Sequence, residues 1–176
     1  MNHFELFGIP ILLKPDPAAL KKRFYELSRR YHPDFFSQAA EAEQADALEK
    51  ASQLNKAWKT FQQPDDTIKY VLMLKGLLEE EEKYELAPVF LMEMLELNEE
   101  LMEIEPNETS LSVLDKRIAQ LQHNLYEPVQ QIVEHYQEGI TTEKELLQVK
   151  EYYFRKKYLY RILDKIDAMR NIATRS

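Results

Sequence analysis

The spacing of glycine and proline restricts the fold of this chain more than any other feature. Glycine occurs only three times in 176 residues, and the eight prolines separate long stretches that contain neither residue. Tight turns between strands usually need the left-handed backbone that glycine supplies, whereas proline commonly starts or ends a helix. Within these stretches apolar residues recur every three or four positions, among Leu, Lys, Glu, Gln and Ala, which favour helices. We therefore expect an all-α protein.

The N-terminal part predicts a helical hairpin. Asp16 and Pro17 form an N-cap and a first-turn proline, and the helix that follows buries one stripe. That stripe consists of Leu20, Phe24, Leu27 and Tyr31. At about 100° per residue, basic side chains occupy the opposite face and its flanks. They are Lys21, Lys22, Arg23, Arg29 and Arg30. After Pro33 and a loop, a second helix from about Glu43 is expected to pack antiparallel to the first.

The remainder predicts a second helical unit. A short helix, Ile68–Leu74, ends at Gly76, and the acidic run from Glu79 to Glu82 is typical of a solvated linker. Three apolar helices follow, and their short connections favour an antiparallel bundle. The first of them runs from Pro88 to Pro106, the second is interrupted at Pro128, and the third begins near Thr142. We thus predict a domain at 1–76, an acidic linker at 77–87 and a three-helix bundle at 88–176.

Composition excludes several classes of function. The net charge of −8 argues against general nucleic-acid binding, and the absence of cysteine removes disulfides, thiolate metal sites and cysteine nucleophiles. The four histidines are scattered, so we expect no metal site and no cofactor. No paired nucleophile and base or phosphate-binding loop indicates an enzyme. Neither a targeting pattern nor a run of about 20 apolar residues occurs, so we expect a cytoplasmic protein that does not enter membranes.

One motif gives a specific indication of function. His32, Pro33 and Asp34 follow the basic helix and precede a helix that contains Leu-Asn-Lys-Ala-Trp at 54–58. With the opening Phe-Glu-Leu-Phe-Gly-Ile at 4–9, this arrangement resembles the J-domain. The resemblance implies docking on the ATPase domain of a DnaK-type chaperone, with Asp34 offering a carboxylate to an arginine of that partner. The basic side chains named above would meet an acidic surface, whereas His32 has two open roles, in docking or in holding the loop.

The second half narrows the resemblance. The segment 90–101, Phe-Leu-Met-Glu-Met-Leu-Glu-Leu-Asn-Glu-Glu-Leu, resembles a helix of the HscB-type J-domain co-chaperones of iron-sulfur cluster assembly. Similarity extends along the chain and is weakest between Pro106 and Thr142. The family's client is an IscU-type scaffold protein, and its partner is an HscA-type or DnaK-type ATPase. The contacts that the resemblance implies with the scaffold fall on Leu91, Met92, Leu95, Glu96, Glu99 and Phe154.

The periodicity of this helix leaves two interpretations open. One apolar stripe, on Phe90, Met94 and Leu97, is sufficient for packing, whereas Leu91, Leu95 and Met102 form a second stripe. This second stripe is either buried against another helix or exposed to a client. The resemblance favours the exposed stripe.

Other functions remain as alternatives. A general J-domain protein would deliver unfolded clients to DnaK through a methionine-rich surface, since methionine adapts to many shapes. An enzyme of the hydrolase class and a purely structural adaptor are the others. Binding to a folded scaffold protein would distinguish an HscB-type co-chaperone from a general J-domain protein. A purely structural adaptor would keep its function after Asp34→Asn.

Overall fold

The computed structural model describes residues 1–105 and 107–175, and within these ranges every regular element is a helix. The all-α prediction is therefore confirmed. Contacts divide the chain into two compact units. The N-terminal unit comprises Met1–Leu77 with Val133–Thr142, and the bundle unit comprises Leu78–Ile132 with the described residues from Glu143 onward.

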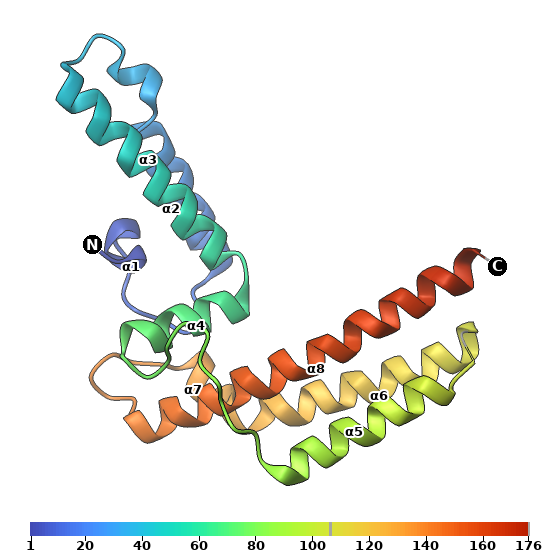
Figure 1. Cartoon of the computed structure of the whole chain (residues 1–176). Coiled ribbons are helices and arrows are strands. Elements are labelled where there is room, and N and C mark those ends of the chain that lie inside the picture. The colour runs from blue at the N-terminus through green and yellow to red at the C-terminus, as the bar shows by residue number, and fades with distance from the viewer. Residues whose placement is uncertain (106, 176) are drawn as a thin grey trace. The chain divides into compact units, whose positions relative to one another are not determined.

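The N-terminal unit is built around a pair of long helices, α2 (Pro17–Arg30) and α3 (Glu41–Phe61), which lie side by side in Figure 1. The expected N-cap is present, because the Asp16 carboxylate accepts the backbone N–H of Ala19 at 3.1 Å. Between α2 and α3 the chain forms the single turn η1 (Pro33–Phe36). The shorter helices α1 (His3–Phe7) and α4 (Pro64–Leu74) complete the unit.

Packing of α2 follows the predicted stripe. Leu20 and Leu27 of α2 and Leu54 of α3 are buried, and the Phe24 and Trp58 rings stack at a centroid distance of 4.5 Å. Tyr31, at the end of the predicted stripe, is only half-buried. Aromatic and aliphatic side chains of α1 and α4 close the core, and they are Phe4, Phe7, Ile68, Val71 and Leu72.

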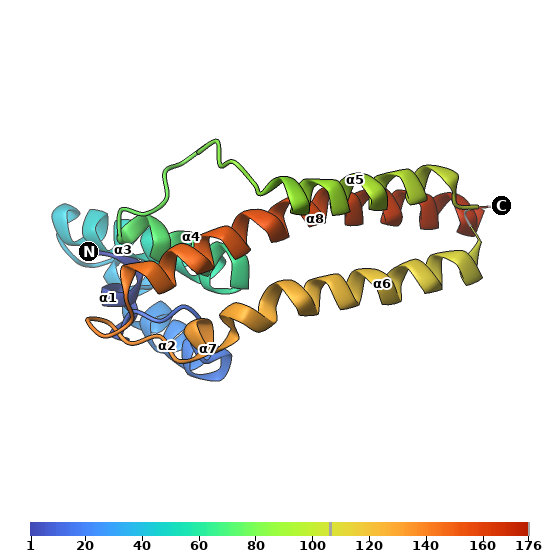
Figure 2. The ribbon, with the colours of Figure 1, turned by 90° about the horizontal axis from the view of Figure 1, so that it is seen from below.

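The bundle unit consists of α5 (Pro88–Glu103), α6 (Glu108–Tyr126) and α8 (Glu143–Arg175). Figures 1 and 2 show α6 running antiparallel to both α5 and α8, which confirms the predicted three-helix bundle. The core draws on all three helices and consists of Phe90, Met94, Leu97, Leu101, Leu111, Leu114, Ile118, Leu159 and Ile162.

Proline and glycine mark the breaks between these helices. Pro106, where the sequence predicts the end of α5, lies outside the described residues. At Pro128 the chain forms the short turn η2 (Glu127–Val129) before α7 (Gln130–Glu134), as expected from a residue that lacks a backbone N–H. Gly139 adopts a φ of 80°, which explains glycine in the turn before α8.

The segment 77–87, predicted as an acidic linker, has no helix or strand but is anchored to the bundle. Leu78 is 5% exposed, and the Glu82 carboxylate lies 2.7 Å from the Lys150 ammonium on α8. The Tyr84 ring stacks on Phe154 of the same helix. Residues 78–87 are therefore an ordered segment on the bundle unit, called the strap below. The predicted domain boundaries, after residues 76 and 87, stay a prediction.

The segment Val133–Thr142 belongs by its contacts to the N-terminal unit, although the predicted domain boundaries place it in the bundle. Charged side chains attach it. Glu134 pairs with Lys14 at 3.2 Å, and Glu138 pairs with Lys75 and accepts a hydrogen bond from the Tyr136 hydroxyl.

None of the helices in the described ranges is long and apolar enough to cross a bilayer.

Candidate interaction surfaces

The predicted docking turn lies at the end of α2, where η1 exposes it to solvent. His32 is the N-cap of η1, and its Nδ1 accepts the backbone N–H of Asp34 at 3.3 Å. The side chain of Asp34 is 89% exposed, and its carboxylate lies 3.6 Å from the same imidazole. Pro33 restricts the backbone between the two residues. His32 therefore shapes the turn, and the carboxylate of Asp34 remains open to a partner.

The five basic residues predicted for docking occupy three different surroundings. Lys21, Lys22 and Arg29 are exposed. Arg23 is only partly exposed, because its Nε donates to the Phe7 carbonyl at 2.8 Å and its Nη1 donates to a carboxylate on the same helix. Arg23 thus fastens α1 to α2, whereas the other three residues leave their charge in solvent.

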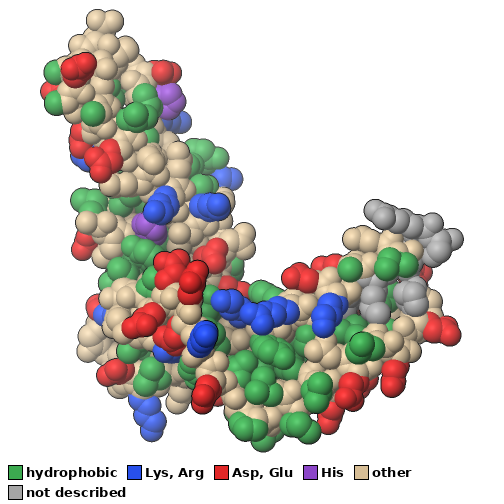
Figure 3. Space-filling model, viewed as in Figure 1, with side chains coloured by type: hydrophobic (Ala, Val, Ile, Leu, Met, Phe, Trp, Pro, Cys, Tyr) green, Lys and Arg blue, Asp and Glu red, His purple; other side chains and the backbone are tan. Residues whose placement is uncertain are grey.

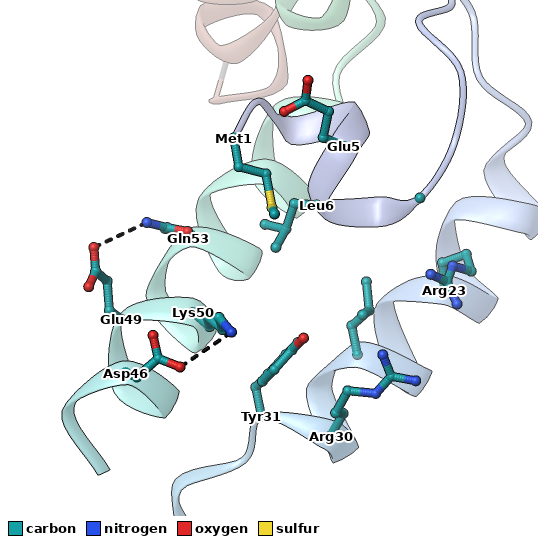
Figure 4. A pocket seen from close by; sticks show the side chains of 12 residues that line it. Met1, Glu5, Leu6, Arg23, Arg30, Tyr31, Asp46, Glu49, Lys50 and Gln53 are labelled. Carbon is teal, nitrogen blue, oxygen red and sulfur yellow. Dashed lines mark hydrogen bonds and ion pairs between the residues drawn. The ribbon is translucent and has the colours of Figure 1, made fainter. Parts of the chain in front are cut away.

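Arg30 lines a pocket between α1, α2 and α3, which Figure 4 shows. Arg23 and Arg30 lie on the α2 side, and Asp46 and Glu49 lie on the α3 side. Lys50 pairs with Asp46 at 3.3 Å and lies 5.1 Å from the centre of the Tyr31 ring. Both signs of charge therefore meet in this pocket, and Arg30 is exposed, like Arg29.

The second stripe of α5 is exposed, so the interpretation that both stripes are buried is wrong. Leu91 is 38% exposed, Leu95 52% and Met102 86%, whereas the packing stripe at Phe90, Met94 and Leu97 is at most 3% exposed. The other predicted contacts on α5 share the exposed side, and they are Met92, Glu96 and Glu99. Exposed apolar side chains beside carboxylates can bury a modest area against another protein.

Phe154, the predicted contact on α8, is half-buried because the strap covers one face of its ring. Tyr84 stacks on it at a centroid distance of 4.7 Å and an interplanar angle of 1°. Lys150 lies 5.6 Å from the Tyr84 ring and pairs with Glu82. The hydrogen bond from Lys150 lowers the pKa of Glu82, and burial raises the pKa of Tyr84.

Leu91 and Phe154 line the same open groove, which brings two separately predicted contacts together. Sequence reasoning missed the other walls of this groove, including Tyr84, Lys157 and Arg161. Lys157 and Arg161 follow Phe154 at intervals of three and seven, a spacing that placed all three on one helix face. In the described part of the chain, no three or more His, Asp or Glu side chains are grouped to hold a metal ion.

Comparisons with known proteins identify relatives of this chain. The family described as the HSCB C-terminal oligomerisation domain matches residues 86–167. A protein of Vibrio vulnificus named co-chaperone protein HscB homolog is 39% identical over 125 residues, which are 69% of this chain and 73% of that protein.

Two solved structures are similar over nearly the whole chain. Chaperone HscB from Vibrio cholerae has a TM-score of 0.75 and 28% identity, covering 98% of this chain and 99% of its own. Human co-chaperone protein HscB has a TM-score of 0.78 and 28% identity, covering 96% of this chain and 81% of its own.

Proposed function

Because this chain belongs to the HscB family of co-chaperones, we propose that it binds an IscU-type scaffold protein and delivers it to an HscA-type or DnaK-type chaperone. In doing so it stimulates the ATPase of that chaperone and assists iron-sulfur cluster transfer. The chemical step, ATP hydrolysis, takes place in the partner. This chain contributes two binding surfaces, one on each unit.

The observation that carries the proposal is the presentation of Asp34. Its carboxylate is 89% exposed, although the backbone that holds it is constrained by Pro33 and capped by His32. A carboxylate in a preformed turn can accept hydrogen bonds from an arginine of the chaperone with little loss of conformational entropy. The exposed charges of Lys21, Lys22 and Arg29 would speed association with an acidic surface on that partner.

For the bundle unit we propose that the scaffold covers Leu91, Leu95 and Phe154, with Met92, Glu96 and Glu99 beside them. The support is the exposure of the five α5 side chains above a well-packed core, with the half-buried Phe154 lining the same groove as Leu91. The apolar part of the surface is small, so we expect a reversible complex, which suits a protein that must release its client to the chaperone. We assign the protein to the cytoplasm by its resemblance to the bacterial relatives.

A general J-domain protein is the alternative, because Met92 and Met102 are 58% and 86% exposed and could adapt to many unfolded segments. Folded clients discriminate between the two functions. A dedicated co-chaperone binds the folded scaffold with one defined stoichiometry, whereas a general one prefers unfolded chains.

The test is the steady-state ATPase rate of the chaperone with this protein, with the scaffold, and with both. We expect the two together to stimulate more than the sum of their separate effects, because one chain presents the scaffold and the J-domain at once. Additive rates would refute delivery of the scaffold. Asp34→Asn should abolish stimulation while leaving scaffold binding unchanged.

A further inference from the structure

The groove that holds Leu91 and Phe154 has a basic wall that the proposed function does not use. It lies within the bundle unit, between the strap, α5 and α8. Its lining includes the aromatic side chains of Tyr84, Phe154 and Tyr158, the cations Lys83, Lys157 and Arg161, and the carboxylates Glu82 and Glu85. Lys157 and Arg161, both on α8, define its basic edge. Phe154, Lys157, Tyr158 and Arg161 are spaced as one face of α8, so this edge continues the proposed scaffold surface.

The cations of α8 differ in whether the chain itself neutralises them. Lys150 is paired with Glu82 and its side chain is 14% exposed. Arg155 donates to Glu151 at 2.9 Å and lies against the Phe90 ring.

Lys157 and Arg161 are both exposed, and neither has a carboxylate within ion-pair distance among the described residues. The Arg161 guanidinium lies 6.0 Å from the centre of the Tyr158 ring. These two charges are therefore available to a partner.

Two contacts establish which side of α5 faces each neighbouring helix. Lys165 of α8 donates to the Asn98 side chain at 3.0 Å, and Arg117 of α6 pairs with Glu100. At about 100° per residue, Leu91, Leu95 and Met102 lie next to Asn98, on the α8 side of the exposed surface. Glu96 and Glu99 lie beyond them, away from α8.

The surface thus changes in character from one edge to the other. A basic edge on α8 is followed by an apolar middle on α5 and then by an acidic edge on α5. Figure 3 shows the same order, with blue side chains along α8, green ones between the helices and red ones along the outer side of α5. Opposite charges on the two edges allow only one orientation of a partner with complementary charges.

We propose that Lys157 and Arg161 recognise carboxylates of the scaffold client, so that the bound element presents an apolar ridge with an acidic edge towards α8. The net charge of −8 makes the chain as a whole repel an acidic partner, and Lys157 and Arg161, which have no ion-pair partner among the described residues, offset that repulsion locally. Arg161 is suited to paired hydrogen bonds with a carboxylate because its guanidinium is planar. This inference rests on the proposed function, since it assigns the chemistry of the same client.

The test compares two double variants. The groove variant carries Lys157→Gln and Arg161→Gln, and the control variant carries Lys116→Gln and Lys144→Gln. Both variants lose two positive charges, and all four side chains are exposed. The measured quantity is the Kd for a purified IscU-type scaffold, by titration calorimetry. At an ionic strength of about 0.05 M we expect the groove variant to bind about 5- to 20-fold more weakly and the control to change less than about twofold.

Salt and a charge-preserving variant separate recognition of charge from packing. At about 0.5 M ionic strength the difference between wild type and the groove variant should shrink to about twofold. Lys157→Arg keeps both positive charges and the Arg161 guanidinium, and should bind within about threefold of wild type. Unchanged thermal melting of each variant would show that the bundle is intact.

The outcomes distinguish this inference from the function on which it rests. If the groove variant binds like wild type while Leu91→Ala with Leu95→Ala loses binding, the anionic contact is refuted and the scaffold surface stands. An equal loss in the control variant refutes recognition by this edge, because net charge alone would then explain the effect. If wild type binds no scaffold, both the proposed function and this inference fail.

Discussion

The double variant Leu91→Ala with Leu95→Ala tests the client surface most sharply, because the structure gives both the size of its effect and a matched control. The exposed fractions of the two side chains, 38% and 52%, together amount to about nine-tenths of one leucine. Burial of a whole leucine side chain is worth about 1.5–3 kcal/mol. The alanines keep part of this area, so we expect binding of the scaffold to weaken by about 1–2.5 kcal/mol, or about 5- to 70-fold in Kd.

The same exposures limit the effect on the fold. The buried parts of the two side chains lie at the edge of the core, so their loss should lower the free energy of unfolding by about 1–2 kcal/mol. For a chain of this size, that shifts the melting temperature by about 2–8 °C. The N-terminal unit is unchanged, and stimulation of the chaperone ATPase without scaffold should stay at the wild-type level.

The control removes similar apolar surface elsewhere in the bundle unit. Val113 and Leu147 are 66% and 45% exposed, on α6 and near the start of α8. Val113→Ala with Leu147→Ala should leave the scaffold Kd within about twofold of wild type. Calorimetric titration of both variants checks the reasoning. An unchanged Kd for the variant at Leu91 and Leu95, or equal losses in both variants, would refute a client surface on this side of α5.

Three further predictions concern charged groups. Arg23→Gln should lower the free energy of unfolding by about 1 kcal/mol in a urea titration, because it removes a hydrogen bond that fastens α1; no loss would contradict that role. Lys22→Gln with Arg29→Gln should leave unfolding unchanged but reduce ATPase stimulation, and the reduction should vanish at high salt; a salt-independent reduction would exclude electrostatic steering. Glu82→Gln should lower the free energy of unfolding by about 1 kcal/mol at neutral pH. Because the pKa of Glu82 is lowered by its bond with Lys150, the wild-type advantage exists above the unfolded pKa and disappears as pH falls through the folded pKa. The difference in unfolding free energy between wild type and variant, from urea titrations, should therefore begin to shrink as pH falls below the ordinary glutamate pKa of about 4.3, and a constant difference would argue against the ion pair.

Local patterns sufficed to predict much of the architecture. Spacing of apolar residues predicted the hairpin and the bundle, because each stripe is set within one helix. Asp16 and Pro17 predicted the start of α2 to the residue. The start of α3 was misplaced, since η1 shortens the loop and the helix begins at Glu41 rather than near Glu43. The second stripe on α5 was visible in the sequence, but its exposure depended on where α6 and α8 lie.

Contacts between distant segments could not be predicted in the same way. An acidic run such as Glu79–Glu82 is usually solvated, and only the fold brings Glu82 to Lys150. The stacking of Tyr84 on Phe154 has no local signal for the same reason. Basic residues on one helix look alike in sequence, so the free charge of Arg29 and the bonded guanidinium of Arg23 were separated only by the structure.

The most direct test of the central claim asks whether both surfaces must act on one chain. Asp34→Asn keeps the client surface, and Leu91→Ala with Leu95→Ala keeps the docking turn. The measurement is the ATPase rate of the chaperone with scaffold and an equal mixture of the two variants, at a concentration where light scattering shows monomers. We predict that the mixture stimulates no more than the variant with the intact docking turn does alone. Recovery of the wild-type synergy by the mixture would contradict delivery of the client by a single chain.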